Sequence, residues 1–379
     1  MSARIPANRL LSKGQPAPWF RARALSGSQT YAFDTAAGRP ILMLFFGSTK
    51  QKQAAEAIRL VAARRSLFDD VNACFFGVTV DPSDEAEGRI AQSLPGIRWF
   101  LDYDKAVSRL FGAMADGEGA LYAPHWLVLD PMLRVIDRFR IDEGEQAIAA
   151  LESATARQAL PDWAPVLMVP DILEPSLCRD LIALYQQHGG EESGYMRDVG
   201  GKTVLVSDPA HKVRRDCLVE DEALKQALKV RFTARLSPMV RRVFQFEPTR
   251  MERYLVGCYD AATGGHFRPH RDNTTRGTAH RRFAVTLNLN AGEYEGGDLR
   301  FPEYGARTYC APTGGAIVFS CGLLHEATPN IRGTRYAFLP FLYDEAAADL
   351  REANSHFLEG GEPYRKAAAA EAAADKEAS

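Results

Sequence analysis

The stretch Tyr259-Asp-Ala-Ala-Thr-Gly-Gly-His-Phe-Arg-Pro-His-Arg-Asp272 decides how the second half of this 379-residue chain is interpreted. Its last three residues place an imidazole, His270, and a carboxylate, Asp272, two positions apart. The adjacent glycines at 264 and 265, followed by Pro269, argue against a helix. On a strand, residues two apart point to the same face. The stretch therefore predicts a β-strand that presents a histidine and an aspartate together.

A second histidine, His325, follows the apolar run 315–320 and a short turn. Two imidazoles and one carboxylate on a β scaffold form the facial triad that leaves coordination positions open on Fe(II). Arg335 stands ten positions after His325, where an apolar strand begins. A buried guanidinium needs an anionic partner, which a dicarboxylate cosubstrate would supply through a bidentate pair. Each of these residues alone also fits a structural role, so the prediction depends on their combined order and spacing.

The pattern around these residues divides the chain in two. From residue 250 onward, short strands alternate with Gly, Pro and Asn turns, which is typical of an all-β sandwich or barrel. Helices are expected before it, over 173–187 and 222–244. The first part predicts an α/β layer fold instead, with strands at 39–46, 73–80, 97–101, 125–129 and 134–139 and helices at 52–68 and 144–155. Two prolines between residues 160 and 165 mark the join, which gives domains over 1–158 and 159–360 and an Ala-rich tail over 361–379.

Composition excludes several classes of protein. The 46 Lys and Arg residues balance 48 Asp and Glu, so no nucleic-acid partner is expected. The apolar run 41–46 is far shorter than the roughly 20 residues that span a bilayer, so no membrane association is expected. The first 20 residues show no signal-peptide pattern, and the six cysteines are scattered without a C-x-x-C pair. These features predict a cytoplasmic chain with buried, unreactive thiols.

Residues 163–345 resemble the prolyl 4-hydroxylase branch of the 2-oxoglutarate- and Fe(II)-dependent oxygenases. The resemblance is carried by 259–272, Phe283 to Asn290, Glu295-Gly-Gly-Asp-Leu-Arg-Phe-Pro302, Leu324-His-Glu-Ala-Thr-Pro329 and Gly333-Thr-Arg335. It implies a mainly β double-stranded β-helix, or jelly roll, with flanking helices. It also implies roles for particular residues: His270, Asp272 and His325 as catalytic iron ligands, Arg335 for the distal carboxylate of 2-oxoglutarate, and Tyr259 as a further cosubstrate contact. Asn288 departs from the pattern, because close relatives often have a cosubstrate-binding tyrosine there.

The same resemblance implies a reaction. Fe(II), 2-oxoglutarate and O2 are the expected cofactors, with ascorbate as a further candidate. The expected activity is hydroxylation of a C–H bond in a peptidyl, amino-acid-like or other small-molecule substrate, with release of succinate and CO2. A prolyl peptide is the first choice of substrate. Halogenating relatives lack the carboxylate ligand, so Asp272 favours hydroxylation.

Residues 10–155 resemble the redoxin group of thioredoxin-like folds, peroxiredoxins especially. The matching stretches are Gly14-Gln-Pro-Ala-Pro18, Leu44-Phe-Phe-Gly47, Gly77-Val-Thr-Val-Asp81 and Ala123-Pro-His-Trp126. The resemblance implies a cis-proline at Pro124 and a reactive cysteine at a helix N-terminus, but Gly47 to Ala54 holds no cysteine. Cys74 is expected within a strand. We therefore expect a redoxin-like domain that lacks the catalytic cysteine and serves as a docking module for a protein partner.

Two other functions stay open from the sequence. One is a non-catalytic interaction protein built from two retired enzyme domains. The other is a peroxiredoxin-type peroxidase, which the missing cysteine disfavours. An arginine-rich stretch, with arginines at 268, 271, 276, 281 and 282 opposed only by Asp272, is expected to be a solvated loop or a surface that steers an anionic substrate.

Overall fold

The computed structural model describes residues 10–25, 30–117, 119–158, 162–360 and 364–365. The chain divides into two compact units, Met1–Trp163 with Pro302–Arg307, and Ala164–Phe301 with Thr308–Ser379. Each unit is described by itself. The predicted Ala-rich tail over 361–379 lies outside the described residues, apart from Tyr364 and Arg365.

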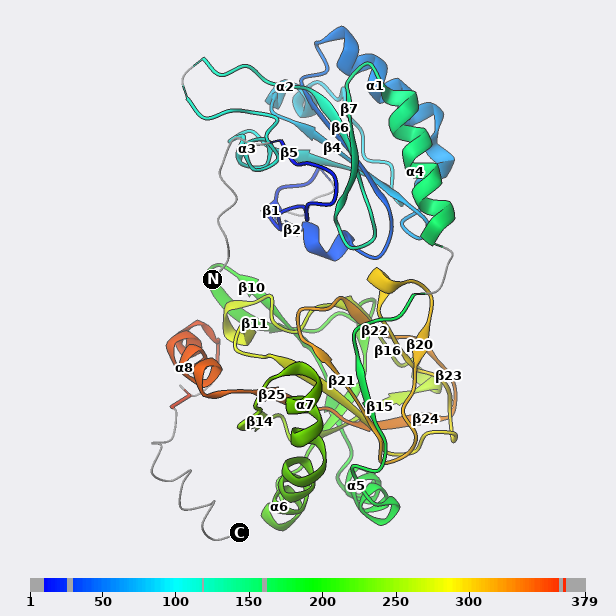
Figure 1. Cartoon of the computed structure of the whole chain (residues 1–379), viewed down its shortest axis with the longest axis vertical. Helices are drawn as coiled ribbons and strands as arrows, with labels where there is room; N and C mark the ends of the chain where they lie inside the picture. Colours follow the sequence, from blue (N-terminus) through cyan, green and yellow to red (C-terminus); the bar gives the residue numbers. More distant parts are fainter. Residues whose placement is uncertain (1–9, 26–29, 118, 159–161, 361–363, 366–379) are drawn as a thin grey trace. The chain divides into compact units, whose positions relative to one another are not determined.

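The first unit is built on a five-stranded sheet in the order β5-β4-β3-β6-β7 (Figure 1). Three strands are parallel, β3 (Ile41–Gly47), β4 (Cys74–Thr79) and β5 (Ile97–Leu101). Strand β6 (His125–Leu129) runs antiparallel to β3, and β7 (Val135–Arg140) runs antiparallel to β6. Strands β3 and β4 are buried along their whole length, as expected for strands covered on both faces. This is the predicted α/β thioredoxin-like arrangement.

Helices and aromatic rings cover the two faces of this sheet. Helices α1 (Lys52–Ala63) and α4 (Gly144–Gln158) pack on one face against alternate side chains of β3, such as Leu42 and Leu44. Buried phenylalanine rings stack on the other face. The remaining elements are short: β1 (Arg21–Ala22), β2 (Tyr31–Ala32), α2 (Pro82–Ala86), α3 (Ala106–Leu110) and 3-10 turns at Phe33–Ala36 and Arg65–Leu67. Within the described residues the cis peptide bond is Leu94–Pro95, so the expectation of a cis bond at Pro124 is wrong.

The second unit is a jelly roll made of two sheets. The larger sheet has the order β14-β25-β17-β24-β15-β13-β9, with β21 and β8 continuing from β17. The smaller has the order β12-β16-β22-β19-β20. The bounds of the larger sheet are β8 (Leu167–Val169), β9 (Glu191–Glu192), β13 (Arg215–Leu218), β14 (Arg250–Glu252), β15 (Leu255–Asp260), β17 (Phe283–Asn288), β21 (Ala316–Ser320), β24 (Thr334–Phe338) and β25 (Phe341–Tyr343). Those of the smaller are β12 (Lys212–Val213), β16 (His266–His270), β19 (Leu299–Arg300), β20 (Thr308–Tyr309) and β22 (His325–Ala327).

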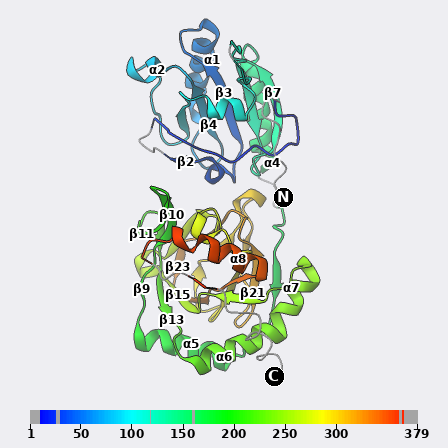
Figure 2. The ribbon, with the colours of Figure 1, turned by 90° about the vertical axis from the view of Figure 1, so that its left-hand side faces the viewer.

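Helices pack on the outer face of the larger sheet. Helices α5 (Pro175–His188), α6 (Glu222–Arg231) and α7 (Ser237–Phe244) bury their apolar sides against β15, β17, β21 and β24 (Figures 1 and 2). A π-helical turn at Phe232–Leu236 separates α6 from α7, where the sequence predicts one helix over 222–244. Pro238 has no N–H to donate to the preceding turn, which explains why the ladder changes there.

Smaller elements complete this unit. They are the hairpin β10 (Tyr195–Val199) and β11 (Lys202–Val206), the pair β18 (Glu295–Gly296) and β23 (Asn330–Arg332), helix α8 (Glu345–Asn354) and 3-10 turns at Ala261–Thr263, Arg276–Thr278 and Ser355–Phe357. Across the described part of the chain, no helix has the length and apolarity needed to cross a membrane.

Candidate active site

Three predicted side chains converge between the two sheets. Strand β16 ends at His270 and pairs with β22 so that His270 lies directly opposite His325. Asp272 follows two residues later, and its backbone N–H donates to the Cys321 carbonyl at 3.0 Å. One nitrogen or oxygen atom from each of His270, Asp272 and His325 lies within 4.8 Å of the other two. The antiparallel pairing of β16 with β22 thus brings together residues that are far apart in the sequence.

The two imidazoles point the same ring nitrogen at the carboxylate. Nε2 of His270 lies 3.5 Å from Asp272 Oδ1, and Nε2 of His325 lies 3.3 Å from Asp272 Oδ2. Their Nδ1 atoms lie 2.8 Å from the Arg268 carbonyl and 3.0 Å from the Leu323 carbonyl. A carbonyl can only accept, so Nδ1 carries the proton and Nε2 presents its lone pair. Backbone contacts of this kind orient metal-ligating histidines in proteins.

The charge states also suit a cation. Burial, together with neighbouring His325, lowers the pKa of His270 to about 4, so this imidazole is neutral at pH 7. Burial alone would raise the pKa of the Asp272 carboxyl, but His325, His270 and Arg281 hold it well below its usual range. A neutral imidazole and an ionised carboxylate are the forms that bind a metal ion.

Aromatic rings wall the cluster. The Phe267 ring stacks on His270 with the centroids 3.5 Å apart and the planes 18° apart. The Phe319 ring meets His325 edge-on, with the centroids 4.6 Å apart. Both rings line the cavity that contains the cluster. They therefore limit the access of water to the side chains they contact.

Arg335 lines the same cavity from the facing sheet. It pairs directly with Tyr259 across β24 and β15, and its guanidinium lies 5.1 Å from the centroid of the Tyr259 ring. Arg335 is only 2% exposed, its Nη2 donates to Asn288 Oδ1 at 3.3 Å, and its Nε has no hydrogen-bond partner. Among the described residues, no carboxylate forms an ion pair with it. A buried cation in this state is suited to an anionic ligand.

Sequence reasoning missed two side chains that contact Arg335. Asn288, noted only as a departure from the family pattern, donates through Nδ2 to the Ala311 carbonyl at 2.7 Å, which turns Oδ1 toward Arg335. The Tyr294 hydroxyl lies 3.6 Å from Cys310 Sγ, and close enough to Arg335 for that cation to act on its pKa. Burial raises the pKa of Tyr294 well above its usual value, so it stays a neutral donor. Its position directly before the Glu295-Gly-Gly motif is the one sequence signal that could have found it.

The arginine-rich stretch is not a solvated loop throughout. Arg271 is 8% exposed and donates to the Gly322 carbonyl. Arg281 Nε donates to Glu252 Oε1 at 2.8 Å, and both side chains are largely buried. Asp272 is the one acid within this stretch of sequence, and the fold adds Glu252 as a second partner. Glu252 precedes Arg281 by 29 positions and reaches it only through the fold.

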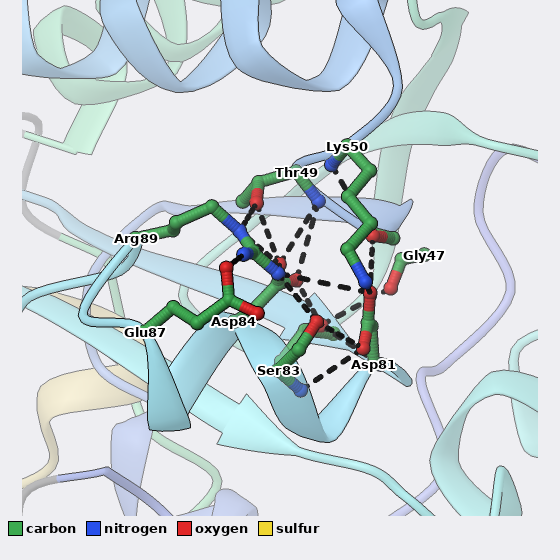
Figure 3. Close-up of polar contacts among 10 residues, drawn as sticks. Gly47, Thr49, Lys50, Asp81, Ser83, Asp84, Glu87 and Arg89 are labelled. Atoms are coloured by element: carbon green, nitrogen blue, oxygen red, sulfur yellow. Dashed lines mark hydrogen bonds and ion pairs between the residues drawn. The ribbon is translucent and has the colours of Figure 1, made fainter.

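In the first unit, a polar network occupies the position expected for a redoxin cysteine. Asp84 is fully buried and accepts hydrogen bonds from Thr49, Thr79 and Arg89 (Figure 3). Asp81 caps α2 through the Ser83 N–H. The two carboxylates thus accept hydrogen bonds from Ser48 and Thr49, in the turn that precedes α1.

The one thiol in residues 1–163 lies elsewhere. Cys74 is buried at the start of β4, whereas Thr79 and the network lie at the strand's other end. At about 3.3 Å per residue, roughly 17 Å separates the two. The arrangement supplies no thiol to the site where a redoxin would react.

The second unit is similar in sequence to known proteins. Residues 254–343 match the model of the 2OG-Fe(II) oxygenase superfamily. The multifunctional procollagen lysine hydroxylase and glycosyltransferase of Rattus norvegicus is 28% identical over 194 residues, which cover 49% of this chain and 24% of that protein. A PKHD-type hydroxylase of Synechococcus sp. is 32% identical over 96 residues, which cover 24% of this chain and 42% of that protein. The chain thus spans about a quarter and about two fifths of the lengths of these relatives.

Solved structures resemble each part. A prolyl hydroxylase from Trichoplax adhaerens, in complex with a hypoxia inducible factor peptide fragment, has a TM-score of 0.40 and 18% identity, and covers 49% of this chain and 86% of that chain. A peroxidoxin from Mycobacterium tuberculosis has a TM-score of 0.31 and 18% identity, and covers 38% of this chain and 97% of that chain. The family match covers the segment from Tyr259 to Arg335 that builds the site. The second unit is therefore an oxygenase domain of the 2OG-Fe(II) superfamily, whose cofactors are Fe(II), 2-oxoglutarate and O2.

Proposed function

We propose that this chain hydroxylates a C–H bond of a peptidyl or amino-acid-like substrate and converts 2-oxoglutarate and O2 to succinate and CO2. The observation that carries the proposal is the convergence of His270, Asp272 and His325 in one cavity with Arg335, a buried cation that pairs with no carboxylate among the described residues. The first three side chains hold Fe(II) in this proposal. Arg335 binds the distal carboxylate of 2-oxoglutarate, and Tyr259 contacts the same cosubstrate.

The donor set fits this assignment. Two imidazole nitrogens and one carboxylate leave positions open on Fe(II) for further ligands. When bound, the iron supplies the coupling of 2-oxoglutarate oxidation to oxygen insertion, with one oxygen atom of O2 entering the substrate and the other entering succinate.

The protein's own side chains provide positioning and shielding. The carbonyls of Arg268 and Leu323 keep a proton on Nδ1 of each histidine, so Nε2 stays available. Asn288 accepts a hydrogen bond from the Arg335 guanidinium and so holds it in place, and Tyr294 offers a neutral donor nearby. We therefore assign Tyr294 the second carboxylate contact that the sequence left open at Asn288.

The names of the relatives support hydroxylation of an amino-acid unit. Both curated relatives are called hydroxylases, and one of them is a procollagen lysine hydroxylase. The intact Asp272 fits this reaction, because the family's halogenating members lack the carboxylate. Peptidyl hydroxylation, with proline as the first residue to test, is accordingly our substrate proposal.

The test is conversion of 2-oxoglutarate by the full chain. The protein is loaded with Fe(II) without oxygen, air and 2-oxoglutarate are added, and succinate and CO2 are measured. Peptides and metabolites from a cell lysate are then screened by mass spectrometry for a gain of one oxygen. We expect equal amounts of succinate and CO2. If iron does not bind and no succinate forms, the second unit is a non-catalytic domain, and the interaction-protein alternative replaces the proposal.

For the first unit we propose a non-catalytic role. Residues 1–158 form a redoxin-like domain whose former thiol position is filled by the Asp84 network, and this domain recruits the protein that is modified. Comparing the full chain with a chain that starts near residue 160 tests recruitment. We expect a higher KM for a protein substrate without the first unit, at an unchanged rate of 2-oxoglutarate conversion. An unchanged KM would argue against recruitment.

A further inference from the structure

A second arginine lines the cavity from the end opposite Arg335. Strands β15 and β24 run antiparallel, with Tyr259 beside Arg335 at one end and the Leu339 N–H bonded to the Leu255 carbonyl at the other. Arg253 lies two residues before Leu255 and also lines the cavity, together with Phe341. The cavity that holds the His-Asp-His cluster therefore has a guanidinium at each end.

Arg253 has unused donors, unlike Arg214, which also lines the cavity. Arg214 is saturated, because Nε and Nη2 donate to Asp216 at 2.6 and 2.7 Å and Nη1 donates to the Tyr259 hydroxyl at 3.3 Å. Within the described part of the chain, Arg253 makes one hydrogen bond, from Nη2 to Asp216 Oδ2 at 3.2 Å. Its Nε and Nη1 stay available at the cavity, and its side chain is 32% exposed.

Positive charge is in excess at this end. Four guanidinium groups share two carboxylates: Arg214 and Arg253 pair with Asp216, and Arg281 and Arg351 pair with Glu252. His280 Nε2 also lies 3.0 Å from Glu252. Burial, with Arg214 and Arg281 nearby, lowers the pKa of Arg253 to about 10, which leaves it charged at pH 7. Cations clustered in a partly buried site are costly unless an anion joins them.

The backbone at Arg253 is also unusual. Its φ is +65°, a left-handed conformation that residues with a side chain rarely adopt. Such conformations persist where the surroundings fix them and are common at binding sites. In this conformation the Arg253 side chain lines the cavity and reaches Asp216.

We propose that the substrate carries a carboxylate near the carbon that is oxidised, and that Arg253 binds it. This inference rests on the proposed function, in which Arg335 is occupied by 2-oxoglutarate and only the Arg253 end is left for the substrate. Nε and Nη1 of Arg253 are the donors offered to the carboxylate. The aromatic ring of Phe341, 5.8 Å from the Arg253 guanidinium, provides an apolar surface for the adjoining carbon chain. Acidic peptides, peptide C-termini and free amino acids all meet this description.

The experiment compares matched substrates with and without carboxylates. The iron-loaded full chain is given a proteome-derived peptide library, the same library after methyl esterification, the free amino acids, and the amino acid amides. Succinate release and the gain of one oxygen are measured. We expect the carboxylate-bearing member of each pair to react about tenfold to a hundredfold faster at limiting concentration, as for loss of a charge-assisted pair. In the Arg253→Gln variant this ratio falls toward one, and Arg253→Lys restores part of it.

The control variant Arg332→Gln and a separate measurement of 2-oxoglutarate conversion distinguish failure of this inference from failure of the proposed function. Arg332→Gln changes an arginine on β23 whose side chain is 76% exposed, so the preference for carboxylates is expected to persist. Equal reaction of the esterified and free libraries overturns the inference, as does a preference that survives Arg253→Gln. Conversion of 2-oxoglutarate without oxidation of any peptide or amino acid also overturns it. Absence of 2-oxoglutarate conversion in every sample contradicts the proposed function instead.

Discussion

At the scale of single residues, the buried charge of Arg335 destabilises the protein without ligand and favours the binding of an anion. Its guanidinium is buried, and among the described residues it pairs with no carboxylate and donates only to Asn288. A buried charge of this kind costs stability until an anion pairs with it. Arg335 therefore lowers the stability of the ligand-free protein, as expected of a group whose role is to bind an anionic ligand.

This leads to a prediction for Arg335→Met. The variant should be as stable as the native chain, or more stable, without ligand, because an unpaired buried charge is replaced by an apolar side chain of similar length. Its KM for 2-oxoglutarate should rise at least tenfold. Urea unfolding and succinate formation measure the two effects. Arg214→Met is the matched control and should lose about 3 kcal/mol, because it takes a paired cation from Asp216. A large loss of stability in Arg335→Met would contradict our description of the pocket.

The sequence predicts which residues meet only where local spacing and strand pairing decide it. His270 and Asp272 share a strand end, and His325 begins the neighbouring strand, so their convergence follows from motif order. The contacts of Tyr294 with Arg335 and of Glu252 with Arg281 join segments about 30 to 40 positions apart. No periodic pattern marks such pairs, because the loops between them decide which side chains meet.

At the scale of elements, buried strands and capped helices were predictable, because their signals are local. Strands β3 and β4 and the Asp81 cap of α2 lie where the sequence predicts them. The interruption between α6 and α7 was not predicted, since the apolar periodicity continues through residues 232–236. The apolar side of α6 and α7 packs on the larger sheet without interruption, although the helical hydrogen-bond pattern changes between them.

Strand β6 carries a buried histidine, His125, which makes the free energy of unfolding of the first unit depend on pH. His125 stacks on Phe45 at 4.9 Å, and burial lowers its pKa to about 4. The unfolded chain, with a pKa near 6.5, binds a proton that the folded chain does not. The first unit therefore loses stability as the pH falls from about 6.5 to 4, by about 2 kcal/mol between pH 7 and pH 5.

His125→Phe should remove most of this pH dependence while keeping the stacked ring. Urea unfolding at pH 7 and pH 5, followed by tryptophan fluorescence, measures it. All four tryptophans lie in residues 1–163, so the signal reports on the first unit. An equal drop in unfolding free energy for the native chain and the variant would show that His125 is not the group that titrates.

At the scale of the whole molecule, all the proposed catalytic residues belong to one unit. The first unit has a thioredoxin-like sheet, but Asp84 and its partners occupy the turn before α1, and Cys74 is buried in β4. We therefore predict background rates of thiol-dependent peroxide consumption for the full chain. Cys74→Ala should leave that rate unchanged in an assay of peroxide loss with dithiothreitol. Consumption that alkylation of the protein abolishes would support the peroxidase alternative.

We have proposed that His270, Asp272 and His325 hold one Fe(II) that drives 2-oxoglutarate conversion. The most direct measurement is iron bound per chain and succinate formed per iron, compared among the native chain, His270→Ala, His325→Ala and the control His188→Ala, which changes an exposed histidine at the end of α5. We predict one iron per chain and steady succinate formation for the native and His188→Ala proteins. Both site variants should lose iron and form no succinate. Equal iron binding and succinate formation in all four proteins would contradict the assignment of this site.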